Sequence, residues 1–278
     1  MLLLFLILQT ITLKTMKSSE NNKISAVLRR NRITELLREN QEVNIPELAD
    51  LFSTSEMTIR RDLDLLAEQG FVRRTHGGAA AAERMEFQFD FVERRTRNHK
   101  AKQAIALEAS KLVQPGQRVI LDTGTTTLEL AYLLKNAEHL TVITPSLAVA
   151  SVLQFSTGIQ TILLGGVIRK GSPDLTGVVT EKVLDMFMVD IAFQGADGIG
   201  LNGELFNSDM RIAQVDTKMR QRAEKTYILC DSSKIGRMEF VSNGSLSEVN
   251  ALITDNSISN DGLKSLKKIC KEIIICNV

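Results

Sequence analysis

Residues 121–130 read LDTGTTTLEL and lie in the longer, C-terminal part of the chain. The apolar run that leads into it, RVILD (118–122), predicts a buried β-strand, and LELAYLL (128–134) predicts a helix. One glycine and four threonines lie between the two, and the acid Asp122 ends the strand. Threonine hydroxyls and backbone N–H groups at a helix N-terminus suit an anion such as a phosphate. The stretch therefore predicts a strand–turn–helix unit with an anion-binding turn.

The same alternation of strand and helix patterns continues to the end of the chain. Helical patterns cover KAKQAIALEASKLV (100–113) and LAVASVL (147–153). Further short apolar runs, typical of buried strands, are LTVIT (140–144), QTILLGG (160–166), DIAFQGA (190–196), TYILC (226–230), ALITD (251–255) and EIIIC (272–276). Such runs, separated by helices, imply an α/β fold with a mostly parallel sheet covered on both faces.

Polar residues and glycines gather at five of the predicted strand ends. Ligands of α/β sheets bind beyond the carboxyl ends of the strands, where carboxylates can accept hydrogen bonds from sugar hydroxyls and a lysine can neutralise a phosphate. The chain has no Gly-x-x-x-x-Gly-Lys-[Ser/Thr], so the predicted site is not a Walker loop. The predicted effector-binding residues are Asp122, Gly124, Thr125, Thr126, Thr127, Thr144, Ser146, Gly165, Gly166, Asp197 and Lys234.

Upstream, residues 53–63 read STSEMTIRRDL and belong to a second kind of domain. An amphipathic helix is predicted from Ile24 to about Asn40, and a short helix for IPELADLF (45–52). Ser55, with Ser53 as the alternative, is expected to cap a third helix that runs to about Gln69 and ends at Gly70. Two helices joined by a short polar turn predict a helix-turn-helix, whose second helix enters the major groove of DNA.

The exposed face of the third helix and the residues after it fit contacts with DNA. FVRRTHGGA (71–79) predicts a short hairpin wing, and arginine offers a planar donor fork to guanine or to phosphate. Residues 17–74 carry ten basic and ten acidic residues, so they have no net positive charge and would also fit a simple helical bundle. The placement of arginines on the third helix and the wing favours DNA binding. The predicted DNA-binding residues are Ser55, Met57, Thr58, Arg60, Arg61, Arg73, Arg74 and His76.

These patterns divide the chain into a leader (1–23), a winged helix-turn-helix (24–79), a linker (80–98) and an α/β sensor domain (99–278). Phe87, Phe89 and Phe91 of the linker are expected to pack against the next domain. The leader has no basic residue ahead of its apolar run and no Ala-x-Ala after it, and the run is too short to span a bilayer. We therefore expect residues 1–15 to be a start-codon artefact, with Met16 as the true start of a cytoplasmic protein that has no membrane partner.

The composition excludes several classes of protein. The formal net charge is +1, which argues against a generally basic protein, and three cysteines without a Cys-x-x-Cys pair are too few for a disulfide framework. The three histidines, His76, His99 and His139, do not form a metal-ligand spacing. The sequence predicts no metal, no cofactor and no catalytic residue.

Both halves resemble one family. VNIPELADLFSTSEMTIRRDLDLLAEQGFVRRTHGGA (43–79) is similar to the winged helix-turn-helix of the DeoR family of bacterial sugar-metabolism regulators. LDTGTTTLELA, TVIT, LLGG, GADGI, DSSK and LITD, in this order, resemble the effector domain of that family. The resemblance implies a fold like that of ribose-5-phosphate isomerase, a phosphorylated sugar or related metabolite as effector, double-stranded operator DNA as partner, and repression of a carbohydrate utilisation operon. A homodimer or homotetramer is expected, because paired half-sites need two recognition helices.

Two other functions stay open from the sequence. A sugar-phosphate isomerase-like enzyme with an appended DNA-binding domain could use Asp122 or Asp197 as its base. A protein-interaction module that reuses the winged helix would not bind a specific operator in a salt-dependent way.

Overall fold

The computed structural model describes residues 26–68, 71–81, 91, 93–169 and 172–278. The chain divides into two compact units, Met1–Phe89 and Asp90–Val278, which are taken separately below. The predictions for the leader, for Ile24, for Gly70, and for Phe87 and Phe89 lie outside the described residues. None of the described helices is long and apolar enough to cross a membrane.

The smaller unit contains the three predicted helices. They are α2 (Ala26–Asn40), α3 (Ile45–Leu51) and α4 (Glu56–Glu68). Ser55 caps α4, since its Oγ accepts the Thr58 N–H at 3.2 Å. The apolar stripes of the helices meet in one core made of Ile33, Leu37, Ile45, Leu48, Ala49, Ile59, Leu63, Leu66, Val72 and Ala79.

The predicted hairpin wing is present and belongs to a small sheet. β2 (Val72–Arg74) pairs antiparallel with β3 (Gly78–Ala81), and β3 pairs with β1 (Glu42–Asn44), which the sequence patterns missed. A Cβ at Gly78 would lie 1.9 Å from the carbonyl oxygen of Val43. Only glycine therefore lets β3 approach β1 so closely.

A buried ion pair fixes α4 against α2. Asp62, on the inner side of α4, is 4% exposed and accepts hydrogen bonds from Arg29 Nε at 2.6 Å and Arg30 Nη1 at 3.2 Å. The pair determines how the helix that carries the predicted DNA contacts is held.

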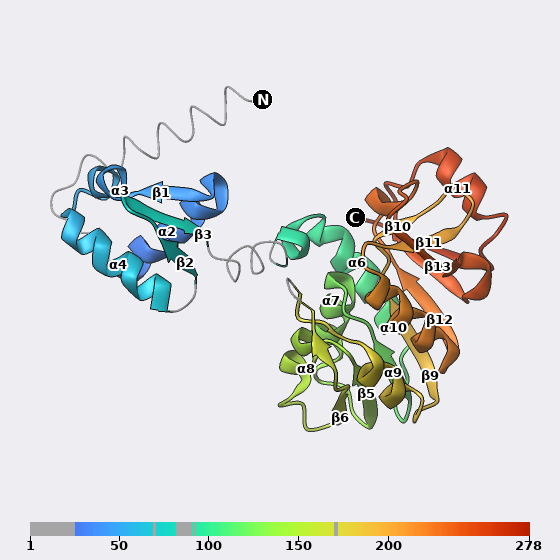
Figure 1. Cartoon of the computed structure of the whole chain (residues 1–278). Helices are drawn as coiled ribbons and strands as arrows, with labels where there is room; N and C mark the ends of the chain where they lie inside the picture. The colour runs from blue at the N-terminus through green and yellow to red at the C-terminus, as the bar shows by residue number, and fades with distance from the viewer. Residues whose placement is uncertain (1–25, 69–70, 82–90, 92, 170–171) are drawn as a thin grey trace. The chain divides into compact units, whose positions relative to one another are not determined.

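The larger unit is built on a seven-stranded parallel sheet with the strand order β15-β14-β12-β9-β4-β5-β6, of which β5, β6, β9 and β12 are labelled in Figure 1. All seven predicted strands are confirmed, with bounds shifted by at most a few residues. They are β4 (Arg118–Leu121), β5 (Leu140–Thr144), β6 (Ile159–Leu163), β9 (Val189–Gln194), β12 (Ala223–Leu229), β14 (Ala251–Asp255) and β15 (Ile273–Cys276). The chain builds outward from β4 to β6, then returns to the other side of β4 with β9, so β4 and β9 flank the point where the strand order reverses.

Helices cover both faces of this sheet. α6 (His99–Ser110), α7 (Thr125–Leu134) and α8 (Leu147–Leu153) pack on one face, where Val119 and Leu121 of β4 point. Ile120, between them, points to the other face, which α9 (Val178–Leu184) and α10 (Met210–Gln221) cover. This alternation is expected of a strand buried on both sides.

The sequence patterns missed a second, smaller sheet in the larger unit. β10 (Gly198–Ile199), β11 (Glu204–Asn207) and β13 (Val241–Ser245) form it, and it packs with α11 (Asn260–Leu266) around Ile199, Leu205, Leu246 and Leu266. The glycines of GIGLNG (198–203) have the Gly-x-Gly-x-x-Gly spacing, but they form the β10–β11 hairpin. Because no helix follows them, they do not form a dinucleotide-binding turn. The remaining short strands, β7 (Val167–Ile168) and β8 (Leu175–Thr176), pair antiparallel beyond β6.

Candidate functional site

The N-terminal half of α4 presents a polar and partly apolar surface. Met57 is 59% exposed, and Arg60 and Arg61 are exposed beside it. Thr58 is half-buried, with its hydroxyl 2.9 Å from Ser55 Oγ. Arg60 forms an exposed ion pair with Glu56 at 3.3 Å. Of the predicted contacts on this helix, Arg61 is therefore an exposed arginine with no carboxylate partner among the described residues.

The wing residues divide into two groups. Arg73 and His76 are exposed. Arg74 is half-buried and bonds back to its own unit, because Nη1 donates to Gly78 O at 3.0 Å and Nε lies 3.1 Å from Asp64 Oδ1. The structure thus gives Arg74 a role in holding the wing against α4.

The larger unit has a cavity at the carboxyl ends of β4, β9 and β12, where the strand order reverses. Six of the predicted effector residues line it: Asp122, Gly124, Thr125, Thr126, Asp197 and Lys234. They come from turns far apart in the sequence. The sheet brings these turns together because β4, β9 and β12 are neighbours.

The other five predicted effector residues do not line this cavity. Their polar groups serve the backbone: Thr127 Oγ1 donates to Asp122 O at 2.8 Å, and Thr144 Oγ1 donates to Leu121 O at 2.7 Å. Ser146 caps α8, and Gly165 O accepts from a threonine hydroxyl of α9. Gly166 lies beside that threonine. These residues follow β5 and β6 or face inward on α7, so they shape the turns around the cavity.

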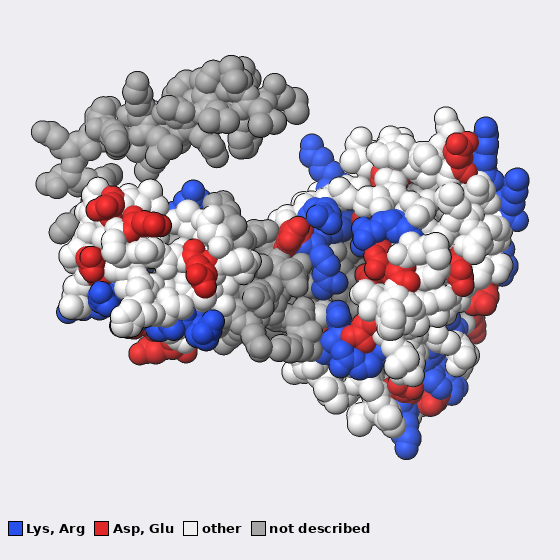
Figure 2. Space-filling view, turned by 45° about the horizontal axis from the view of Figure 1, so that its top comes forward, with Lys and Arg blue, Asp and Glu red and all other residues white. Residues whose placement is uncertain are grey.

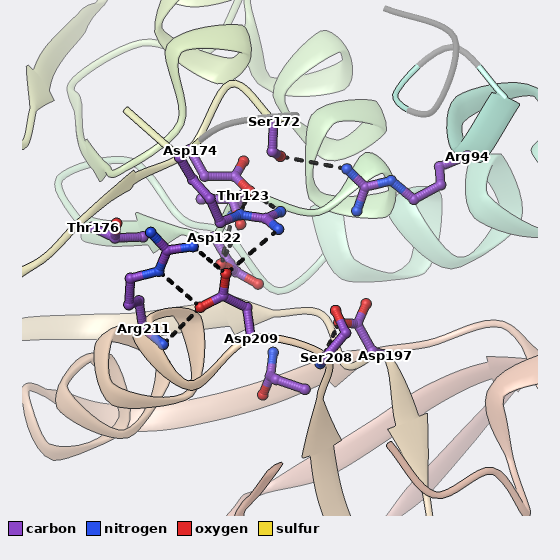
Figure 3. Close-up of polar contacts among 12 residues, drawn as sticks. Arg94, Asp122, Thr123, Ser172, Asp174, Thr176, Asp197, Ser208, Asp209 and Arg211 are labelled. Atoms are coloured by element: carbon purple, nitrogen blue, oxygen red, sulfur yellow. Dashed lines mark hydrogen bonds and ion pairs between the residues drawn. The ribbon is translucent and has the colours of Figure 1, made fainter. Parts of the chain in front are cut away.

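Two of the carboxyl groups that line the cavity, those of Asp122 and Asp197, have pKa values shifted in opposite directions. Burial, partly offset by the N–H donors of Gly195 and Thr123, raises the pKa of Asp122 to about 6. Burial also acts on Asp197, but hydrogen bonds from the N–H and hydroxyl of Ser208, at 2.9 and 2.7 Å, hold its pKa below the usual value (Figure 3). The charges of nearby Lys234 and Arg94 act in the same direction.

The sequence patterns missed most of the positive charge at this site. Figure 2 shows Lys and Arg side chains around a hollow of the larger unit. The cations that line the cavity are Arg94, Arg97, Lys102, Arg169, Lys234 and Arg237. Arg169 is paired with the buried Asp174 at 2.7 Å, and Arg237 with Glu239 at 2.9 Å.

Lys102 is the residue that the sequence could have revealed. It is 6% exposed and lies on the same face of α6 as Ile105, Ala106 and Ala109. A lysine three, four and seven residues before buried apolar residues of a helix is expected to be buried as well. Burying its charged ammonium group costs desolvation free energy unless a partner or a ligand compensates. Burial lowers the pKa of Lys102 to about 8.

The arrangement can bind an anion and a polyol together. The start of α7 and the cations line the cavity and can bind an anion, and the carboxylates supply acceptors for hydroxyls. No aromatic ring is among the described residues that line it, so the described wall offers no stacking surface for a nucleobase. Among the described residues no group of three or more His, Cys, Asp and Glu could hold a metal ion.

Comparison with known proteins identifies both units. A family model described as a DeoR-like helix-turn-helix domain matches residues 29–85, and one described as a DeoR C terminal sensor domain matches residues 97–256. Together they cover most of the chain.

Relatives match almost the whole chain. An HTH-type transcriptional regulator, YulB, of Bacillus subtilis (strain 168) is 35% identical over 239 residues, which is 86% of this chain and 92% of the relative. The regulator GolR of Listeria innocua is 34% identical over 83% of this chain and 91% of its own. The glycerol-3-phosphate regulon repressor of Escherichia coli (strain K12) is 32% identical over 82% of this chain and 90% of its own.

Solved structures are more distant. The ribose 5-phosphate isomerase A of Methanocaldococcus jannaschii is 25% identical, with a TM-score of 0.37, and the match covers 49% of this chain and 54% of that enzyme.

Proposed function

The chain belongs to the DeoR family of transcriptional regulators, and from that premise we propose that its smaller unit reads an operator and its larger unit senses a phosphorylated sugar or a related metabolite. The chain is a DNA-binding transcriptional regulator and not an enzyme, as the matching relatives are regulators over more than four fifths of its length. The isomerase function that the sequence left open is therefore set aside.

The observation that carries the effector proposal is the meeting of Gly124, Thr125 and Thr126 with Lys102 and Lys234 in one cavity. Backbone N–H groups at a helix N-terminus and two lysines suit a phosphate, and Asp122 and Asp197 suit the hydroxyls of an attached sugar. We propose that the effector releases the protein from the operator of a carbohydrate utilisation operon. The name of the Escherichia coli relative, a glycerol-3-phosphate regulon repressor, supports this direction of control.

A screen of sugar phosphates by thermal unfolding tests the effector proposal. A ligand that binds only the folded state raises stability by RT ln(1 + [L]/Kd), about 2.7 kcal/mol at a hundred times Kd. We expect at least one sugar phosphate to stabilise the larger unit, with the unphosphorylated sugar as control. Equal stabilisation by both would contradict a phosphate site.

We propose that Arg61, with Met57 and Thr58, reads bases, and that Arg73 and His76 contact phosphates. Arg61→Ala is then expected to cost about 1–3 kcal/mol of operator binding and to relax the choice of sequence, because a bidentate contact to a base is lost. Arg73→Ala is expected to weaken binding to all sequences and to reduce the salt slope by about one.

Both effects are measured by titrating the variants with DNA that the wild-type protein selects from a random library, at several salt concentrations. Arg32→Ala, which removes an exposed arginine of α2 that is not among the predicted DNA contacts, is the control. Normal operator binding by a folded Arg61→Ala protein would refute the assignment.

Asp122 predicts a pH dependence of stability. Since its pKa is about 6 when folded and near 4 when unfolded, its protonated form is favoured in the folded state. This contribution is fully present below about pH 4 and is lost as the pH rises through about 6, a total of roughly 3 kcal/mol. Asp122→Asn, which cannot ionise, is expected to gain stability relative to the wild type between these values. Urea unfolding of both proteins at acid and neutral pH measures this, and a constant difference would contradict it.

The proposal also covers the domain bounds, the cellular location and the oligomeric state of the protein. We propose the leader, DNA-binding domain, linker and sensor domain with the bounds given above, in a cytoplasmic homodimer or homotetramer. Sedimentation of the full chain tests the assembly, and a monomer that binds its operator as tightly as any larger species would contradict it.

A further inference from the structure

The segment from Glu93 to Asn98 lies between the DNA-binding unit and α6, and it contacts the effector cavity at several points. The carbonyl of Arg94 accepts a hydrogen bond from Lys102 Nζ, and Thr125 Oγ1 lies 3.5 Å from the same oxygen. Asn98 Nδ2 donates to Asp231 Oδ1 at 2.8 Å and to Ser233 Oγ at 3.1 Å. The segment is therefore tied to α6, to α7 and to the turn after β12.

The side chain of Arg94 reaches into the cavity. It lines the wall, and Nη2 lies 3.4 Å from Ser172 Oγ (Figure 3). Among the described residues no carboxylate lies within ion-pair distance of this guanidinium. The guanidinium of Arg94 can therefore pair with an anion bound in the cavity.

Arg94 belongs to a group of three cations that repel one another. Burial is the main cause that lowers the pKa of Lys102, and the charges of Lys234 and Arg94 lower it further, while Asp231 opposes them. Lys234 and Arg94 also act together on Asp197. Like charges at this range favour an arrangement in which an anion lies between them.

We propose that Arg94 is a third ligand of the effector's phosphate and that the bound phosphate holds the 93–98 segment more tightly against α6, α7 and the turn after β12. This inference rests on the proposed function. Lys102 comes from α6 and Lys234 from the turn after β12, so a phosphate held by these two and by Arg94 joins the segment to both. In the sequence the segment lies between the DNA-binding unit and α6, so holding it in place constrains the part of the chain that connects to that unit. A ligand can shift such an equilibrium only through contacts that differ between the two states, and the Arg94 contact supplies one.

The neighbouring Arg95 gives a matched control. Its Nε lies 3.7 Å from Glu129 Oε1, and its guanidinium lies 5.1 Å from the ring centre of Tyr132. Both partners are on α7, and Arg95 does not line the cavity. Arg94→Gln and Arg95→Gln thus remove one positive charge each from the same turn, but only the first removes it from the cavity.

Hydrogen exchange of the full chain, with and without inorganic phosphate at constant ionic strength, tests the proposal. In the wild type and in Arg95→Gln, phosphate is expected to slow amide exchange about tenfold both at 124–127 and at 93–98. In Arg94→Gln the affinity for phosphate is expected to fall about tenfold, the size of one charge-assisted hydrogen bond. At saturating phosphate this variant should be protected at 124–127 only.

The other possible outcomes contradict either the role of Arg94 or the phosphate site itself. Protection at 124–127 without protection at 93–98 in the wild type, or equal behaviour of the two variants, would overturn the role of Arg94 and leave the effector site standing. No protection at 124–127 in the wild type would overturn the phosphate site itself, and the role of Arg94 with it.

Discussion

Replacing Asp62 with alanine is expected to lower the free energy of unfolding of the DNA-binding unit by about 3–5 kcal/mol, because the change takes its carboxylate from the buried Arg29. The change removes one ionic partner of the buried Arg29, so part of the compensation for its desolvation is lost. Since the Asp62 pair also holds α4 against α2, operator binding should fall together with stability.

The control for this variant, Asp64, lies two residues away in the same helix. Asp64 pairs with Arg74, but its side chain is 60% exposed, so Asp64→Ala should cost less than about 1 kcal/mol. Thermal unfolding of the full chain, followed by hydrogen exchange in α4, compares the two. Equal losses of stability would mean that the Asp62 pair does not hold the unit together.

The second large effect concerns the turn after β4. Changing Thr125 and Thr126 together to valine should abolish the response to the effector while operator binding without effector stays intact. Each change replaces a hydroxyl of the cavity wall with a methyl group of similar size, so the N-terminus of α7 loses two hydrogen-bond donors to the proposed phosphate. Thr126 is buried, so the volume-conserving change keeps the packing of the helix.

Operator affinity with and without the stabilising sugar phosphate measures this response. Thr141→Val, in β5 and away from the cavity, is the control and should respond as the wild type does. A double variant that responds like the wild type would place the effector elsewhere.

The regular parts of the fold could be predicted because their pattern is local. Continuous apolar runs such as those of β5 and β14 are buried on both faces, and their bounds agree with the structure to the residue. The three helices of the smaller unit follow from apolar periodicity and from the cap at Ser55. Short strands such as β1 and β10 were missed, because two or three residues carry no periodicity and depend on a distant partner.

Part of the cavity could be predicted because its residues follow strands that the sequence pattern reveals. Asp122, Asp197 and Lys234 follow recognisable strands, and parallel strands bring their carboxyl ends to one edge. The turns after β5 and β6 have the same composition, but the strand order puts them on the far side of β4 from β9 and β12. The sequence patterns did not predict Arg94 and Lys102 as residues of the cavity, because neither follows a strand.

The most direct test of a ligand-controlled regulator is the affinity of the full-length wild-type protein for its selected DNA, measured with and without the sugar phosphate that stabilises it most. We expect saturating ligand to lower this affinity by a factor of about 5–150, the usual range of coupling between two sites. An affinity that the ligand leaves unchanged would contradict the account.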